Sequence, residues 1–441
     1  MASVTTSAEE LGSLTTAWST SVTREDALSV PRILLVSSLF LAPIPFGSVD
    51  PWAASALVVL VCTVLTLWAW HSVRRETLRL VWTPLYIPAG LFLAFTITQL
   101  LLHRTVEAID TRNSLINFSA DVLLFFLTVH LFAGVGTRTW NRFASALGLY
   151  AAALSVFAIV QFFSDSSRVF FSLDPGANAY VFGPYISHNS YAGLMEMLIP
   201  LTGAFLLSRG RTDRGQYLLG FALLLEMASV VVSGSRGGVL SVIVEATLFL
   251  MILMSQGRSR RSTILAVLVL VATLLGSWWM VPTSVRQRFT DAVHGADPSY
   301  QVRGVIRGDA LRIAHDYLLT GTGLGTFAAV YPQYQSLSTD EIVDEAHNDY
   351  VQAVVETGVI GAAIIASVLV LFLYRFRSAT RFRSSSVVQW MRAGAVVACC
   401  GLLVHSWADF NLHIPANAAW FAFCAGLSQV PFKPAALQRT A

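Results

Sequence analysis

The stretch Asp344-Glu345-Ala346-His347-Asn348-Asp349-Tyr350 lies at the boundary between a long polar segment and an apolar run. An apolar run, residues 353–374, begins just after it and is long enough to cross a bilayer, which takes about 17–25 mostly apolar residues. Before it lies a polar segment that starts near residue 282. A histidine, an asparagine and acidic residues at the mouth of an apolar run indicate a site for a polar or anionic ligand at the membrane surface.

Composition decides the class of protein before any motif is considered. Hydrophobic residues make up 55% of the sequence and charged residues only 12%, whereas roughly 25% of the residues in a soluble domain are charged. We therefore expect an all-α polytopic membrane protein. The net charge of +3 is too small to indicate a nucleic-acid partner. The cysteines lie inside apolar runs without metal-site spacing, and we interpret them as small core residues; they are Cys62, Cys399, Cys400 and Cys424.

The apolar runs predict about twelve transmembrane helices. They cover residues 31–47, 51–70, 83–102, 116–134, 143–163, 190–208, 217–234, 237–254, 263–281, 353–374, 387–406 and 414–430. Residues 1–30 lack the apolar centre of a signal peptide and are predicted to form a flexible cytoplasmic tail. The predicted organisation is then nine membrane helices in residues 31–281, a long extracytoplasmic catalytic loop with amphipathic helices in 282–349, three membrane helices in 350–430, and a cytoplasmic tail in 431–441.

The arginines predict the orientation of these helices, because short cytoplasmic loops are enriched in positive residues. Arginine clusters follow every second run, and they are Arg74, Arg75 and Arg79; Arg138 and Arg142; Arg209, Arg211 and Arg214; Arg258, Arg260 and Arg261; and Arg375, Arg377, Arg381 and Arg383. Both termini are therefore expected in the cytoplasm and the long loop outside the cytoplasmic (inner) membrane. Since nucleotide sugars are cytoplasmic, a reaction in that loop needs a donor that is already activated.

Two loop arginines are predicted to share a helix face. Apolar residues recur at three- and four-residue steps, as in an amphipathic helix; they are Val302, Val305, Ile306, Ala310, Ile313 and Tyr317. Arg303 and Arg307 then project together and suit a phosphate or diphosphate group, to which a guanidinium can donate two hydrogen bonds. A solvated cationic face or anchoring to anionic lipid is the alternative.

Further polar residues fall on the same predicted side. Arg236 lies in Ser-Gly-Ser-Arg-Gly-Gly, where small neighbours would let a ligand approach, or where a tight hairpin simply carries an arginine. His188 and Asn189 form a second His-Asn pair at the start of an apolar run. A crowded turn holds His405, Asp409, Asn411 and His413. We expect no metal, because no ligand pair has the helical spacing of a zinc site.

Three acidic residues fall well inside apolar runs, where a charge is unfavourable; they are Asp121, Glu226 and Glu245. They are either parts of a proton path or neutral or paired structural residues. A proton path would favour a secondary transporter, although no internal repeat supports that class.

Four motifs in fixed order carry a family resemblance. They are Arg236 in its glycine-serine setting, Arg303 ahead of Ala310, the turn at residues 319–327, and residues 346–352 followed by Glu356-Thr357-Gly358-Val359-Ile360-Gly361. Together they resemble the O-antigen ligase and polymerase superfamily, most strongly over residues 180–365. The resemblance implies a multi-spanning membrane enzyme whose long outer loop acts on polyprenyl-diphosphate-linked glycans in cell-surface polysaccharide or lipopolysaccharide biosynthesis.

The resemblance also implies roles for individual residues. Catalysis would fall to His347, Arg303 and Arg236, and the residues expected to bind substrate are Arg307, Asn348, His188, Asn189 and Tyr350. The family often has an aromatic residue at the position of Arg307, so either arginine of the loop could fill the family role.

The expected reaction is an inverting glycosyl transfer without metal, cofactor or nucleotide. The two arginines would stabilise the diphosphate leaving group, and His347 would accept the proton of the acceptor hydroxyl or, alternatively, only form structural hydrogen bonds. Aromatic residues could stack on sugar rings or lie at the membrane interface; they are Tyr180, Tyr185, Tyr331, Tyr334 and Trp407. The short outer segment 164–189 favours a ligase over a polymerase with the same donor, and a secondary transporter or a non-catalytic scaffold are the remaining alternatives.

Overall fold

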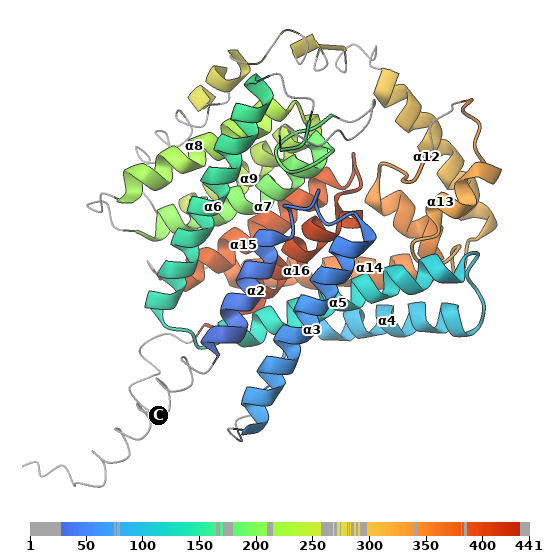
Figure 1. Cartoon of the computed structure of the whole chain (residues 1–441), viewed down its shortest axis with the longest axis horizontal. Coiled ribbons are helices and arrows are strands. Elements are labelled where there is room, and N and C mark those ends of the chain that lie inside the picture. Colours follow the sequence, from blue (N-terminus) through green and yellow to red (C-terminus); the bar gives the residue numbers. More distant parts are fainter. Residues whose placement is uncertain are drawn as a thin grey trace, which may run out of the picture.

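A computed structural model describes most of the chain. The described residues are 28–74, 76, 80–164, 168–170, 180–209, 215–256, scattered positions between 268 and 291, 298–338, 343–380, 382 and 386–432. The predicted N-terminal tail therefore lies outside the described residues except for residues 28–30, as do about half of the predicted span 263–281 and most of the C-terminal tail. Figure 1 shows that the regular structure is helical throughout.

Among the described residues, eight helices are long and apolar enough to cross a membrane. They are α3 (Pro51–Arg74), α5 (Ala108–Phe132), α6 (Thr137–Phe163), α7 (His188–Ser208), α8 (Gly215–Ser233), α9 (Arg236–Ser255), α14 (Asp349–Thr380) and α15 (Val387–His405). The all-helical membrane class predicted from composition is confirmed. The predicted count of about twelve stays a prediction.

Three predicted spans coincide with helices of 13 to 16 residues. These helices are α2 (Ser29–Leu41), α4 (Tyr86–Leu101) and α16 (Pro415–Gln429). The first is shorter than its apolar run because Pro43 and Pro45 follow directly, and the turn that they enter includes Phe46 and Ser48 with positive φ. Hydropathy alone did not mark that end of the helix.

The centre of the molecule is the pair α7 and α15, which share the most extensive contact between helices. Every residue of α7 from Ser190 to Phe205 is buried. Close approach depends on Gly394 of α15, where a Cβ would lie 2.6 Å from Ala204 Cβ and 2.7 Å from the Pro200 carbonyl oxygen. Small residues at such crossings let helix backbones pack tightly inside a membrane.

The long helix α14 contains a break at Gly358, whose φ of 59° and ψ of −166° are not helical. The glycine-rich turn after α12 (Pro298–Asp316) fits against this break. Thr322 N donates to Val355 O at 2.9 Å, and Val359 N donates to Leu318 O at 2.9 Å. The turn thus follows the end of one helix and satisfies backbone groups that the break leaves open.

The polar segment contains the amphipathic helix α12, which packs with the short α13 (Phe327–Val330) and the first turns of α14 (Figure 1). Ile306, Ala310 and Ile313 are buried in a small second core, as predicted. Val302 and Val305 were predicted on the same face but are 38% exposed. The apolar period therefore holds only from the middle of α12 onward.

Candidate active site

The carboxyl group of Asp409 joins two residues from distant parts of the chain. Asp409 lies in the turn between α15 and α16, and its side chain is buried. His347 Nδ1 lies 3.4 Å from Asp409 Oδ1, and Arg303 Nη2 lies 3.7 Å from Asp409 Oδ2. Arg303 Nη1 also donates to Ala408 O at 2.9 Å. The Arg303 side chain, 21% exposed, and the His347 side chain, 28% exposed, are thus both held at the Asp409 carboxylate.

These contacts set the charge of Asp409. Burial alone would raise the pKa of its carboxyl group, but the hydrogen bond from His347 and the positive charge of Arg303 outweigh burial and hold that pKa below its usual range. Asp409 is therefore ionised at neutral pH. An ionised carboxylate at Nδ1 keeps the proton of the neutral His347 ring on that nitrogen and leaves Nε2 as the basic atom.

His347 itself has a positive φ of 49°, which a residue with a Cβ seldom adopts. Its neighbours hold it there. Ala346 N donates to Gln352 Oε1 at 2.9 Å, and Asn348 Oδ1 accepts from Tyr350 N and Val351 N, both at 3.0 Å. Asn348 is thus the N-cap of α14. Strained backbone held by surrounding hydrogen bonds is frequent at functional sites.

Asp349 ties the same stretch to the turn that carries Asp409. Its backbone N–H donates to Ser406 O at 2.9 Å, and its Oδ1 lies 2.8 Å from His413 Nδ1. Burial would lower the pKa of His413, but Glu345 and Asp349 raise it to about 10, so the ring is a cation at neutral pH. Burial in turn raises the pKa of Glu345 to about 7.

Arg236, at the start of α9, reaches α12 one turn before Arg303, where its Nη2 donates to Ser299 Oγ at 3.3 Å. Packing inside the protein explains why the residue after Arg236 is a glycine. A Cβ on Gly237 would lie 2.4 Å from Cδ2 of His405, so the approaching group is that ring and not a ligand. His405 Nδ1 in turn lies 2.7 Å from Glu196 Oε1, with both side chains buried.

The remaining predicted substrate-binding residues are spread around this centre. Arg307 Nε donates to Arg303 O at 3.1 Å and its guanidinium lies 5.5 Å from the Tyr300 ring centroid. Tyr350 donates to Leu403 O at 2.6 Å. His188 packs 4.5 Å from Tyr180 at the start of α7, beside Asn189. Arg303, and not Arg307, is thus the loop arginine in contact with Asp409.

His188 and Asn189 are connected to the site by the packing of α7 against the turn that carries Asp409. The one-turn helix η2 (Asn411–His413) directly follows Asp409, and a Cβ on Gly193 of α7 would lie 2.2 Å from Asn411 Oδ1. The first turns of α7 therefore pack against the turn that carries Asp409. His188 and Asn189 belong to the same end of the helix bundle as His347, without a hydrogen bond to it.

The roles of two residues, Asp409 and Glu196, were not predicted from the sequence. Asp409 was noted only as part of a crowded turn, and its role depends on a contact between residues 62 positions apart. Glu196 was missed, although it carries the same signal as Glu226 and Glu245, an acidic residue inside an apolar run. Within the described part of the chain, no three His, Cys, Asp or Glu side chains are grouped as metal ligands.

Comparison with known proteins bears on the family of the chain, not on individual residues. No curated protein matches the chain in sequence. The family model described as O-antigen ligase matches residues 219–366, a range that contains Arg236, Arg303 and His347. The match over these residues supports the O-antigen ligase superfamily.

Proposed function

We propose that this protein is an O-antigen ligase-like glycosyltransferase that moves a glycan from a polyprenyl-diphosphate carrier to a hydroxyl group of an acceptor sugar. The superfamily supports a membrane glycosyltransferase of the ligase or polymerase type. The observation that carries the finer proposal is the placement of Arg303 and His347 on the two carboxylate oxygens of Asp409.

His347 is the general base of the proposed reaction. Its Nδ1 donates to Asp409, so Nε2 accepts the proton as the acceptor oxygen attacks the anomeric carbon. The separation of 3.4 Å is long for a hydrogen bond, and such bonds commonly shorten when substrate binds. Asp409 then stabilises the imidazolium by its negative charge, as the aspartate of a catalytic triad does.

The two arginines act on the leaving group. When the bond between the anomeric carbon and the diphosphate oxygen breaks, its electron pair stays on that oxygen, and negative charge grows there. Arg303 uses two of its donors on Ala408 O and Asp409, and a guanidinium has five. Its remaining donors, with those of Arg236, stabilise the developing charge more than the ground state. Direct displacement inverts the anomeric centre.

The central test is transfer by the purified protein with a lipid-linked oligosaccharide as donor. His347→Ala should bind donor normally and lose activity by a factor of roughly 10²–10⁴, the usual contribution of a general base. Wild-type activity should persist in EDTA. Full transfer by His347→Ala, or activity lost in EDTA and restored by a divalent metal, would contradict the mechanism.

The proposed side of the reaction is outside the cytoplasmic membrane, with both termini inside. In a background without the four native cysteines, Ser338→Cys should react with an impermeant thiol reagent in intact spheroplasts. Ser259→Cys should react only after the membrane is opened. The reverse pattern would place the diphosphate chemistry on the wrong side for a lipid-linked donor.

Ligase and polymerase differ only in the acceptor. We propose a ligase, because the second outer segment, residues 164–189, is short. In a deletion strain, long glycan that accumulates on the lipid carrier supports a ligase. Surface acceptors capped with a single repeat unit would instead identify a polymerase.

A further inference from the structure

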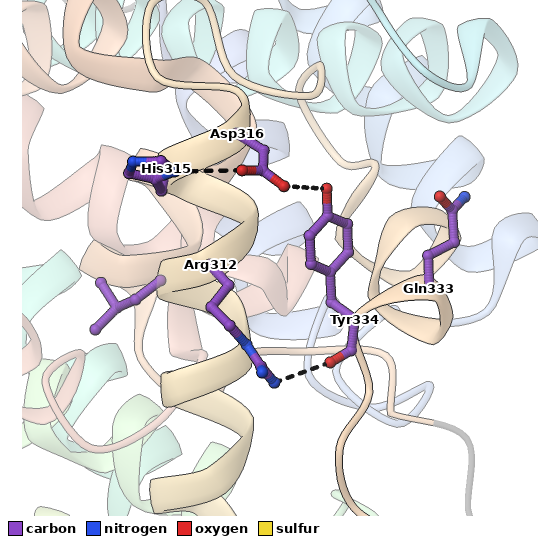
Figure 2. A pocket seen from close by; sticks show the side chains of 6 residues that line it. Arg312, His315, Asp316, Gln333 and Tyr334 are labelled. Carbon is purple, nitrogen blue, oxygen red and sulfur yellow. Dashed lines mark hydrogen bonds and ion pairs between the residues drawn. The ribbon is translucent and has the colours of Figure 1, made fainter.

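A hollow of about 490 Å³ lies on α12, away from the residues that contact Asp409. Leu311, Arg312, His315 and Asp316 form one wall, and Gln333 and Tyr334, just after α13, form the other. Figure 2 shows Arg312 and Asp316 of one wall reaching toward Tyr334 of the other. The volume falls within the range of about 300–1,000 Å³ found for small-ligand sites.

The hollow is connected to the active site along the surface of α12. Residues four apart form a continuous row on a helix, and Arg303, Arg307, Leu311 and His315 are such a row. At a rise of 1.5 Å per residue, His315 lies about 18 Å along the axis from Arg303. An extended chain that has its reacting end at Arg303 can follow this row into the hollow.

Most polar groups of the hollow are held in place by hydrogen bonds. Tyr334 Oη donates to Asp316 Oδ2 at 2.8 Å, His315 Nδ1 lies 3.2 Å from Asp316 Oδ1, and Arg312 Nη2 donates to Tyr334 O at 3.2 Å. Arg312 also pairs with Asp309, which is buried and accepts from Ser336. Groups fixed in this way lose little further freedom when a ligand binds.

The charges and surfaces of the hollow indicate the class of ligand. Arg312 is balanced by Asp309, and hydrogen bonds from Tyr334 and His315 hold the pKa of Asp316 below its usual range, so an acidic group stays ionised at the wall. The site therefore has no net attraction for an anion. Leu311, 58% exposed, adds apolar surface to the lining of the hollow. Apolar surface framed by amide, guanidinium and carboxylate groups suits a neutral sugar ring, which has an apolar face and hydroxyl edges.

We propose that this hollow is an outer subsite that binds neutral sugar residues of the glycan some distance from the reacting bond. The proposal rests on the proposed function for its substrate class. Its consequence is chain-length preference, since donors with several repeat units reach the subsite and a donor with one unit does not. Binding there adds affinity without touching the reacting atoms and therefore lowers KM without changing kcat.

The test uses the full-length protein in nanodiscs and a double variant, His315→Ala with Gln333→Ala. Gln333 is exposed and His315 is 87% exposed, so both can be removed without opening the core. Asn113→Ala, which removes an exposed amide from α5, is the matched control. Transfer is measured with lipid-linked donors of one and of many repeat units, and binding of a neutral hexasaccharide is followed by saturation-transfer NMR.

The double variant should raise KM for the long donor about tenfold, as expected when two hydrogen bonds are lost. It should leave kcat and the KM of the one-unit donor unchanged, and it should lose the hexasaccharide signal that the control variant retains. Leu311→Ala should weaken the same signal. Equal KM values for wild type and double variant with both donors would overturn the subsite, as would tighter binding of an acidic hexasaccharide than of the neutral one.

The two proposals fail in different ways. If His347→Ala transfers glycan at the wild-type rate, the proposed mechanism is wrong, while a hexasaccharide signal that depends on Gln333 still supports the subsite. If transfer depends on His347 and the hexasaccharide does not bind, the subsite is wrong and the transferase stands.

Discussion

His405 and Glu196 form an ion pair in the interior of the helix bundle, with Nδ1 2.7 Å from Oε1 and both side chains buried. The ring of His405 also fills the space beside Gly237, the neighbour of Arg236. The pair therefore connects α7, α15 and the start of α9. His405 O also accepts from Asp409 N at 3.1 Å, which places the pair next to the candidate active site.

Breaking this pair should destabilise the protein. Glu196→Gln or His405→Gln leaves one buried group without its charged partner, which costs about 3–5 kcal/mol. Thermal unfolding in detergent should show a lower Tm for each single variant. The double variant should unfold at a higher temperature than the sum of the two losses predicts. Strictly additive losses would mean that the two side chains do not stabilise one another.

Lysine should replace Arg303 poorly. A guanidinium spans Ala408 O and Asp409 at once, and the single ammonium of lysine cannot reproduce this planar geometry. Arg303→Lys should lower kcat by roughly 10²–10³, as loss of one donor to a developing oxyanion does. Arg307→Lys on the same helix is the control and should retain most of kcat. Equal losses at the two positions would show that contact with Asp409 does not distinguish them.

The break in α14 should tolerate no side chain. Gly358 has φ of 59°, and a Cβ there would lie 2.5 Å from the carbonyl carbon of Leu319. Gly358→Ala should therefore lose about 1–3 kcal/mol from backbone strain alone. Gly308→Ala in α12, where a Cβ would meet nothing within 4 Å, should be neutral or slightly stabilising. Thermal unfolding of both variants checks the contrast, and a neutral Gly358→Ala would mean that the break can straighten.

Glu345 should make stability depend on pH. Burial raises its pKa from 4.5 to about 7, so between these values the folded state binds a proton that the unfolded state has released. Its contribution to stability is complete below pH 4.5 and is lost as pH rises through 7. Glu345→Gln should reduce the fall in Tm across this range. An unchanged slope would assign the pH dependence to other groups.

The sequence predicted the class of fold because hydropathy reports burial in lipid directly. It failed at helix ends such as Leu41, where prolines and local turns decide, and at Val302 and Val305, where one turn of α12 lacks the core that covers the next. The candidate residues Arg236, Arg303 and His347 were found by motif. Asp409 could not be given its role, because its two contacts join segments that only the folded helices bring together.

The junction between the turn at residues 318–323 and the break in α14 is made by main-chain hydrogen bonds. Such bonds do not depend on the identity of the side chains around them, provided that Gly321 and Gly358 leave room for two backbones to meet. Substitutions among the side chains around the junction can therefore leave His347 in register with α12, which carries Arg303. Gly321 and Gly358 are thus the residues of this junction whose identity the contact between the two backbones requires.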